Sequence, residues 1–139
     1  MFETKEGTIK PIVYVGVLNN DKLLLVDYKQ APNPSKVGWW IPAPGLEVGE
    51  DPAEKASQVA AELGIVAQEI KLKDVESFVL PGGWHLIYHY VIKTDSQAVR
   101  NKNIKDFKWV TSHELSEMKD LAHGKWEMGV GMSYLGLQR

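Results

Sequence analysis

Cysteine is absent from this chain of 139 residues. Without thiols there are no disulfides, no cysteine nucleophile and no cysteine-ligated metal site. Long apolar runs are absent too, since the longest, Ile12 to Leu18, is far too short to span a bilayer. The 16 basic residues are scattered among 18 acidic ones, and the net charge is -2. We therefore expect no nucleic-acid polymer and no membrane among its partners, and a cytoplasmic location.

The composition is that of an ordinary globular protein. Hydrophobic residues make up 44% of the chain and charged residues 24%. The chain contains no repeat and no low-complexity linker, and its length suits one domain that buries a real core without disulfides or metals. We expect a single domain over residues 1–139 and leave its oligomeric state open.

The first third of the chain favours strands. Ile9 to Leu18 is rich in β-branched residues, and the turn signal at 19–21 separates it from Lys22 to Tyr28, which predicts a hairpin. The prolines within Gln30 to Lys36 indicate a loop, and Trp39 to Pro42 is predicted to be a short strand.

A helix is predicted from Asp51 to Leu63. Asp51 is a suitable N-cap, Pro52 suits the first helical position, and Glu54 completes a capping box. Apolar residues recur at helical spacing and predict a narrow buried stripe facing a sheet, namely Ala56, Val59, Ala60 and Leu63. Gly64 is a natural stop.

The second half continues with strands and ends with helices. Two strands, Ile70 to Leu80 and Trp84 to Lys93, are predicted to form a hairpin around Pro81-Gly82-Gly83. Three further elements are expected: a short strand over Phe107 to Val110, a helix with a capping box at Thr111 and Glu114, and a tail of mixed helical character from Asp120. Strands and helices interleave without regular βαβ repetition, so the expected class is α/β (α+β), with a mixed sheet between helices.

The segment from Gly38 to Ile65 carries the chemistry. A Gly/Pro-rich loop, an acidic turn and a capped helix follow one another in the order that builds a diphosphate and metal site. The segment resembles the Nudix box, G-x5-E-x7-R-E-U-x-E-E-x-G-U with U a bulky aliphatic, usually preceded by W-x-x-P-G. The matching residues are Trp39, Pro42, Leu46, Glu47, Gly49, Glu50, Gly64 and Ile65. This resemblance, which covers nearly the whole chain, implies the Nudix fold, an α/β/α sandwich with a mixed β-sheet.

The box is degenerate at chemically decisive positions. Pro44 replaces its opening glycine, and thirteen residues separate Glu50 from Gly64, one fewer than in the family pattern. Aligned backward from Gly64, the positions of the arginine and the three glutamates hold Ser57, Gln58, Ala61 and Glu62. Aligned forward from Glu50, they hold Gln58, Val59, Glu62 and Leu63. Both alignments leave Glu62 as the one glutamate of three.

The missing glutamates bear on metal chemistry. Mg²⁺ prefers oxygen ligands in near-octahedral array, and in the family glutamates on one helix face hold it so that a diphosphate is polarised. By this resemblance Glu62 and Gln58 are the candidate catalytic residues, and the candidate metal ligands are Glu47, Glu50, Glu54 and Glu62. We expect Mg²⁺ to be held weakly or not at all. The alternative interpretation of these glutamates is a solvent-facing helix residue at Glu62 and a charged turn closing onto the helix.

Three tryptophans are candidates for ligand binding. Trp39 and Trp40 are adjacent, so on a strand they face opposite sides, and one is expected in the core while the other stacks on a flat ligand. Trp84 is either a pocket wall or a cover for the sheet end. His85 and His89 share a strand face about 13 Å apart by rise alone, which argues against a shared metal.

Three hypotheses for function follow. The first is a Nudix superfamily protein with an eroded catalytic box, which binds a nucleotide or related small molecule and has weak or no pyrophosphohydrolase activity. The alternative is a divergent Mg²⁺-dependent pyrophosphohydrolase of nucleoside diphosphate derivatives. The third is a structural or protein-interaction role on the same scaffold.

Overall fold

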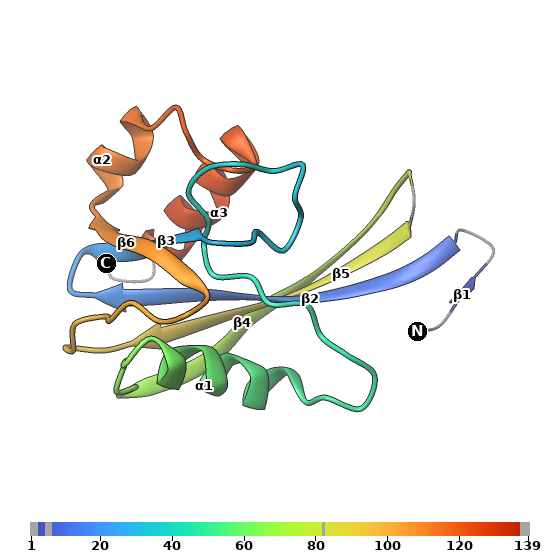
Figure 1. Ribbon diagram of the computed structural model, residues 1–139, viewed down its shortest axis with the longest axis horizontal. Helices are drawn as coiled ribbons and strands as arrows, with labels where there is room; N and C mark the ends of the chain where they lie inside the picture. Colours follow the sequence, from blue (N-terminus) through green and yellow to red (C-terminus); the bar gives the residue numbers. More distant parts are fainter. Residues whose placement is uncertain (1–2, 5–6, 82, 137–139) are drawn as a thin grey trace.

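The computed structural model describes residues 3–4, 7–81 and 83–136, which form a mixed sheet between helices (Figure 1). The elements in chain order are β1 (Glu3–Thr4), β2 (Gly7–Asn19), β3 (Lys22–Tyr28), α1 (Pro52–Glu62), β4 (Glu69–Leu80), β5 (Gly83–Lys93), β6 (Ile104–Val110), α2 (Ser112–Glu117) and α3 (Gly124–Gly136). The strand order is β4-β5-β2-β3-β6, and β1 pairs with β2. The β2–β5 pair is parallel, while the other strand pairs are antiparallel.

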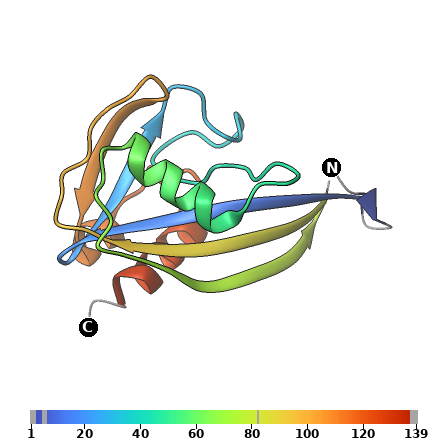
Figure 2. The ribbon, with the colours of Figure 1, turned by 90° about the horizontal axis from the view of Figure 1, so that it is seen from below.

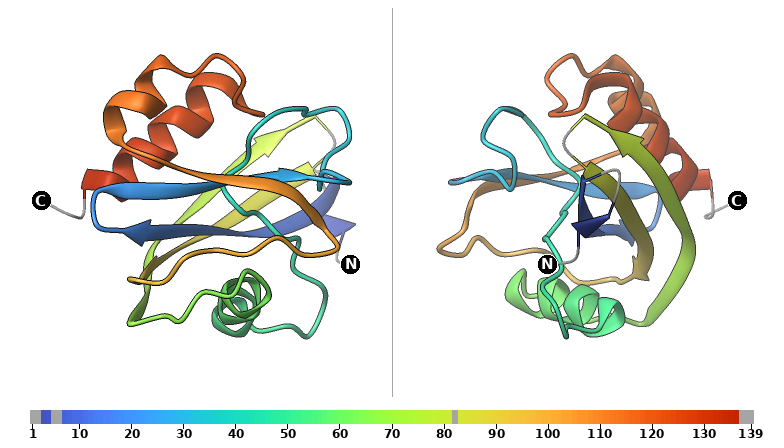
Figure 3. Two further views of the ribbon diagram at one scale, coloured as in Figure 1. Left: turned by 60° about the vertical axis from the view of Figure 1, so that its left-hand side comes forward. Right: turned by 90° about the vertical axis from the view of Figure 1, so that its right-hand side faces the viewer.

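Helices cover both faces of this sheet. Seen from below in Figure 2, α1 crosses in front of the strands. The left-hand view of Figure 3 places α2 and α3 on the opposite side of the sheet from α1. The predicted α/β/α sandwich with a mixed sheet is therefore confirmed. None of the described helices is long and apolar enough to cross a membrane.

Both predicted hairpins are present. The first turns at Asn20, whose φ of 55° is left-handed, and β2 pairs with β3 on either side of it. The second joins β4 to β5, although Gly82 of the predicted turn lies outside the described residues. The predicted strand over Phe107 to Val110 begins earlier, at Ile104.

The predicted strand over Trp39 to Pro42 is wrong. The segment is extended, but only isolated bridges attach it, Trp40 to Val26 and Trp39 to Leu121. Proline has no N–H to donate to a ladder, so the segment that includes Pro42 cannot pair continuously. The carbonyl of Pro42 instead accepts the Val15 N–H at 2.9 Å, which ties the box loop to the middle of β2.

Helix α1 forms where predicted, with two differences. Ala56, Ala60 and Leu63 of the expected stripe are buried, whereas Val59 is half-buried. Asp51 is the N-cap, but its side chain makes no capping hydrogen bond, so the predicted capping box is wrong here. Gly64 ends the helix with a φ of 73°.

The opposite layer consists of α2 and α3. The predicted capping box of α2 is confirmed, since Thr111 and Glu114 each accept the other's backbone N–H. The tail is more regular than predicted, because residues Gly124 to Gly136 form one helix. Its Gly131 lies so close to α2 that an added Cβ would meet Leu115 Cδ2 at 2.7 Å.

Candidate active site

A cavity of about 650 Å³ lies where the box loop meets the end of α1. We call it the box cleft. Its lining comprises Val59, Glu62 and Leu63 of α1, the prolines Pro32, Pro42 and Pro44, the segment 28–30, and residues 101–104 before and at the start of β6. Residues of the box loop and of the end of α1 therefore line one cavity, whereas the acidic turn at 46–50 does not.

Two residues of α1 and its C-cap Leu63 face this cleft. Val59, Glu62 and Leu63 line it, at the i, i+3 and i+4 spacing that puts side chains on one face of a helix. These are the positions to which the alignment from Glu50 assigns the three glutamates. Gln58 and Ala61 are exposed and do not line the cleft. The α1 surface of the cleft is therefore mainly apolar and carries one carboxylate.

Glu62 is held in place by its neighbours. Its Oε1 accepts a hydrogen bond from Gln58 Nε2 at 3.1 Å, one helical turn back. Its backbone carbonyl accepts the Asn101 side-chain amide at 3.0 Å. The two candidate catalytic residues are therefore in contact, but Gln58 reaches the cleft only through Glu62.

The acidic turn before α1 is closed on itself. The Glu50 carboxylate accepts the Glu47 N–H at 2.7 Å and forms an ion pair with Lys55 Nζ, also at 2.7 Å. The Lys55 ammonium and the Glu47 N–H together hold the pKa of Glu50 below its usual range. Glu47 and Glu54 are exposed. Among the residues that the structure describes, no group of three or more histidine, aspartate or glutamate side chains is arranged to hold a metal ion.

Tyr28 connects the cleft to the box loop. Its hydroxyl accepts the Ala43 N–H at 3.0 Å, next to the proline that replaces the box's opening glycine. Burial raises the pKa of Tyr28 to about 12, against the opposing effect of that hydrogen bond. The hydroxyl therefore stays protonated well above physiological pH.

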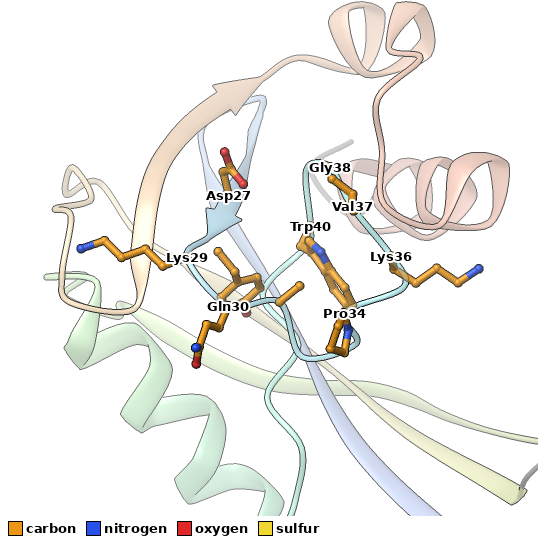
Figure 4. Close-up of a pocket in the computed structure, with 10 residues that line it drawn as sticks. Asp27, Lys29, Gln30, Pro34, Lys36, Val37, Gly38 and Trp40 are labelled. Carbon is orange, nitrogen blue, oxygen red and sulfur yellow. The ribbon is translucent and has the colours of Figure 1, made fainter.

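A second cavity, of about 630 Å³, adjoins the box cleft through Tyr28, Lys29 and Gln30. Figure 4 shows Trp40 in its middle, with Lys29 and Lys36 extending outward on opposite sides. Trp40 is only 3% exposed and meets Tyr28 edge to face at 5.8 Å. Its Nε1 is buried and has no hydrogen-bond partner among the described residues. We call this cavity the Trp40 pocket.

Solved structures of known proteins share this fold. No protein-family model matches the sequence, and neither does any curated protein. A NUDIX hydrolase from Nitrosomonas europaea superposes with a TM-score of 0.73 at 19% identity, over 95% of this chain and 92% of that one. A NUDIX family hydrolase from Clostridium perfringens gives 0.71 at 18% identity, over 93% and 97%. This chain has the Nudix fold.

A longer Nudix-fold protein is also similar. It is a bifunctional NMN adenylyltransferase/ADP ribose pyrophosphatase from Francisella tularensis, solved in complex with AMP and a manganese ion. Its TM-score is 0.67 at 19% identity, and the match covers 93% of this chain and 42% of that chain. At such identities the likeness establishes the fold, and the chemistry depends on the residues that this chain places in it.

On this Nudix fold the three candidate tryptophans are not brought together. Trp40 lines a cavity, whereas Trp39 is half-buried beneath Lys108, whose Nζ lies 4.4 Å from the ring centroid. Trp84 lies at the start of β5 and donates its Nε1 hydrogen to Ser77 Oγ at 2.6 Å, on the neighbouring strand. Neither the box cleft nor the Trp40 pocket is lined by Trp39 or Trp84.

A buried carboxylate on the opposite face escaped the sequence interpretation. Glu127 of α3 is fully buried and accepts the Ile41 N–H at 2.9 Å. It also accepts the His123 backbone N–H at 3.2 Å and lies 2.8 Å from His123 Nδ1. In the sequence, the one local indication of this buried carboxylate is the i, i+4 spacing of His123 and Glu127. Glu127 fixes the box loop from behind, between Trp40 and Pro42.

His89 takes part in a second buried network on this face. Its Nδ1 and Nε2 contact the Tyr134 hydroxyl and Glu76 Oε1, at 2.5 and 2.6 Å. His85 instead stacks on Phe78 at 5.4 Å between ring centroids. The two histidines therefore have separate partners, as the strand spacing indicated.

Proposed function

We propose that this protein binds a nucleotide or related small molecule in the box cleft and the adjoining Trp40 pocket, and hydrolyses phosphoanhydrides weakly or not at all. The observation that carries the proposal is the α1 surface of the cleft. Val59 and Leu63 flank Glu62 there, so this surface offers one carboxylate and two apolar side chains.

The donor set does not fit a catalytic metal site. Mg²⁺ is usually held by carboxylates together with substrate phosphates and retained waters. Glu62 is the one carboxylate that lines the cleft, and Glu50 is already paired with Lys55. Leu63 is 2% exposed and offers no oxygen ligand. These residues therefore do not support a metal-dependent step.

The two cavities suit a small, partly apolar ligand of low charge. Each lies within the range of about 300 to 1,000 Å³ typical of small-molecule sites. Tyr28 and Trp40 supply aromatic surface, and side-chain amides of Gln30 and Asn103 supply hydrogen-bonding groups. Lys29, Lys36 and Lys102 add positive charge, which favours a single phosphate, whereas Glu62 opposes a polyphosphate without metal. AMP bound to the Francisella protein is a ligand of this kind.

The alternative is a divergent Mg²⁺-dependent pyrophosphohydrolase of nucleoside diphosphate derivatives. Two observations support this alternative. Gly49 of the acidic turn has a left-handed φ of 88°, and the name of the Francisella protein includes an ADP ribose pyrophosphatase. In that case Glu47, Glu50, Glu54 and Glu62 would have to supply the metal shell between them, which requires the Glu50 to Lys55 ion pair to open.

The test is a substrate panel combined with binding measurements. We expect turnover of nucleoside di- and triphosphates and dinucleotide polyphosphates with Mg²⁺ to stay near background, while thermal shift or tryptophan fluorescence detects nucleoside monophosphates or nucleosides. Robust turnover that is lost in Glu62→Gln would establish the divergent enzyme instead. If no member of the panel binds, the structural or protein-interaction role becomes the better interpretation.

A matched pair of variants tests the geometry of the cleft. Val59→Glu adds a carboxylate three residues before Glu62 on the face that lines the cleft, so we expect Mg²⁺ or Mn²⁺ to raise its melting temperature. Gln58→Glu adds the same charge one residue away, outside the lining, and should show no such rise. A metal response in Gln58→Glu alone would favour the backward alignment of the box.

A further inference from the structure

The outer edge of the sheet at β4 is unpaired. In the described part of the chain β4 pairs only with β5, and it is the outermost strand of the sheet in the right-hand view of Figure 3. A strand of twelve residues therefore presents its free N–H and C=O groups to solvent. Such an edge is a template for pairing with another strand.

This edge is unusually apolar. Five of its large hydrophobic side chains are 39% to 59% exposed, namely Ile70, Leu72, Val75, Val79 and Leu80. Exposed apolar side chains that form a continuous surface mark interaction sites, whereas single ones are ordinary. Some other surface is expected to cover this strand.

The charge pattern of residues 71–76 in β4 is complementary to the same pattern in reverse order. The six residues 71–76 are Lys-Leu-Lys-Asp-Val-Glu, so reversing the order exchanges bases for acids. If two copies of β4 pair antiparallel about a point between Lys73 and Asp74, Lys71 lies opposite Glu76 and Lys73 opposite Asp74. By symmetry each contact occurs twice, and opposite charges directly across a strand pair are stabilising. Shifting the pairing by one residue either way puts Lys73 opposite Lys73, or Asp74 opposite Asp74.

The orientation of the side chains agrees with this register. The pairing of β4 with β5 shifts between Leu72 and Asp74, so that Leu72 is opposite Tyr90 and Val75 opposite Tyr88. Tyr88 and Tyr90 are two residues apart, hence Leu72 and Val75 face the same side of the sheet. In the proposed pairing these two apolar residues lie opposite each other and share a face, as a continuous sheet requires.

We propose that a second copy of this chain binds β4, antiparallel and centred between Lys73 and Asp74, to form a twofold-symmetric dimer with one continuous sheet. A dimer about a twofold axis needs a surface that complements itself. Residues 71–76 have that property in sequence, and Leu72 and Val75 also have it in the side of the sheet that they face. The dimer uses the far edge of the sheet and does not depend on the box cleft or on its ligand.

Charge reversal provides the decisive experiment, with molecular mass measured by light scattering over a range of protein concentrations. We expect the wild type to dimerise. For Lys71→Glu and for Glu76→Lys we expect the dissociation constant of the dimer to rise about tenfold or more, since each change places like charges opposite one another. An equimolar mixture of the two variants restores both pairs and should form a heterodimer. Lys119→Glu, an equal charge change on an exposed residue after α2, should leave the dimer intact.

A crosslink tests the register separately, because Glu76 also contacts His89 and its replacement could disturb folding. The chain has no cysteine of its own, so oxidation of mixed Leu72→Cys and Val75→Cys chains should give one disulfide-linked heterodimer, and neither variant alone should crosslink. A wild type that stays monomeric at every concentration overturns the proposal. So does a dimer that ignores the charge reversals, or a cysteine mixture that fails to crosslink.

Discussion

Carboxylates on the two faces of the sheet occupy opposite environments. On the α1 face, Glu47, Glu54 and Glu62 are exposed, and the Glu62 side chain accepts a hydrogen bond from the neighbouring Gln58. On the α3 face, Glu127 is fully buried and accepts hydrogen bonds from Ile41 and His123. The box loop thus has a fully buried carboxylate directly behind it.

The contacts that fix the box loop are separate from the candidate metal ligands. The loop that enters the cleft is fixed by Glu127 from behind and by Tyr28 from the front, which accept the N–H groups of Ile41 and Ala43. Neither contact needs a metal or the glutamates of α1. The loop is therefore held in place independently of the α1 positions to which the family pattern assigns glutamates.

The largest expected effect comes from removing the buried carboxylate. Glu127→Ala leaves the Ile41 and His123 N–H groups without acceptors, and each buried donor left unsatisfied costs about 1 to 3 kcal/mol. Urea unfolding should show this loss. Glu62→Ala is the matched change on the other face and should lie within about 0.5 kcal/mol of the wild type, since the side chain is exposed. Equal losses in both variants would refute the contrast between the faces.

Close packing on the α3 face can be tested within one helix. Gly131→Ala places a methyl group 2.7 Å from Leu115 Cδ2 and 3.0 Å from Leu23 Cδ2, and overpacking a core costs about 1 to 3 kcal/mol. Gly129→Ala meets nothing within 4 Å, so it should stabilise α3 by up to about 1 kcal/mol through helix propensity. Thermal or urea unfolding of the two variants should give opposite signs. A stabilised Gly131→Ala protein would show that α2 and α3 pack loosely.

The sequence predicts what depends on local periodicity. Strand hairpins, the buried stripe of Ala56, Ala60 and Leu63, and the capping box of α2 all follow from residues a few positions apart. The fold class follows from the order of these elements together with the resemblance of the box.

Contacts between distant residues were not predictable in this way. Glu127 lies 86 positions from Ile41, and no local pattern marks a helical glutamate as an acceptor for a distant loop. The single-residue deletion in the box left two alignments, and only the packing of α1 shows that Val59, rather than Gln58, lines the cleft. The missing side-chain cap at Asp51 likewise depends on the position of the carboxylate, which residue type does not specify.

Alkaline pH tests a property that the two faces share. Burial raises the pKa of Tyr28 to about 12 on the cleft side, and it also raises the pKa of Tyr134 on the α3 side. Tyrosine in an unfolded chain has a pKa of about 10, so above that pH the unfolded state releases protons that the native state keeps. The free energy of unfolding should therefore be unaffected below about pH 10 and fall by about 1.4 kcal/mol per pH unit for each such tyrosine above it.

Tyr28→Phe should make this decline shallower, because one retained proton is removed. Chemical unfolding from pH 9 to about pH 12 measures the slope. Tyr134→Phe is the companion variant on the α3 face and should reduce the slope in the same direction. An unchanged slope in Tyr28→Phe would mean that this tyrosine ionises at the same pH in both states.

The smallest effect concerns how the helices on the two faces begin. Thr111 accepts the Glu114 N–H at 3.2 Å, and Glu114 accepts the Thr111 N–H at 2.9 Å, so the start of α2 is capped by side chains in both directions. Asp51 stands at the same position before α1, but its side chain accepts no such bond, and Pro52 removes one of the N–H groups that would need a cap.

Thr111→Ala should therefore cost about 1 kcal/mol, the typical value for a lost N-cap. Asp51→Ala should cost only a few tenths, through its charge near the helix N-terminus, and that small cost should disappear at high salt. A full capping loss in Asp51→Ala would show that the carboxylate caps α1 in solution.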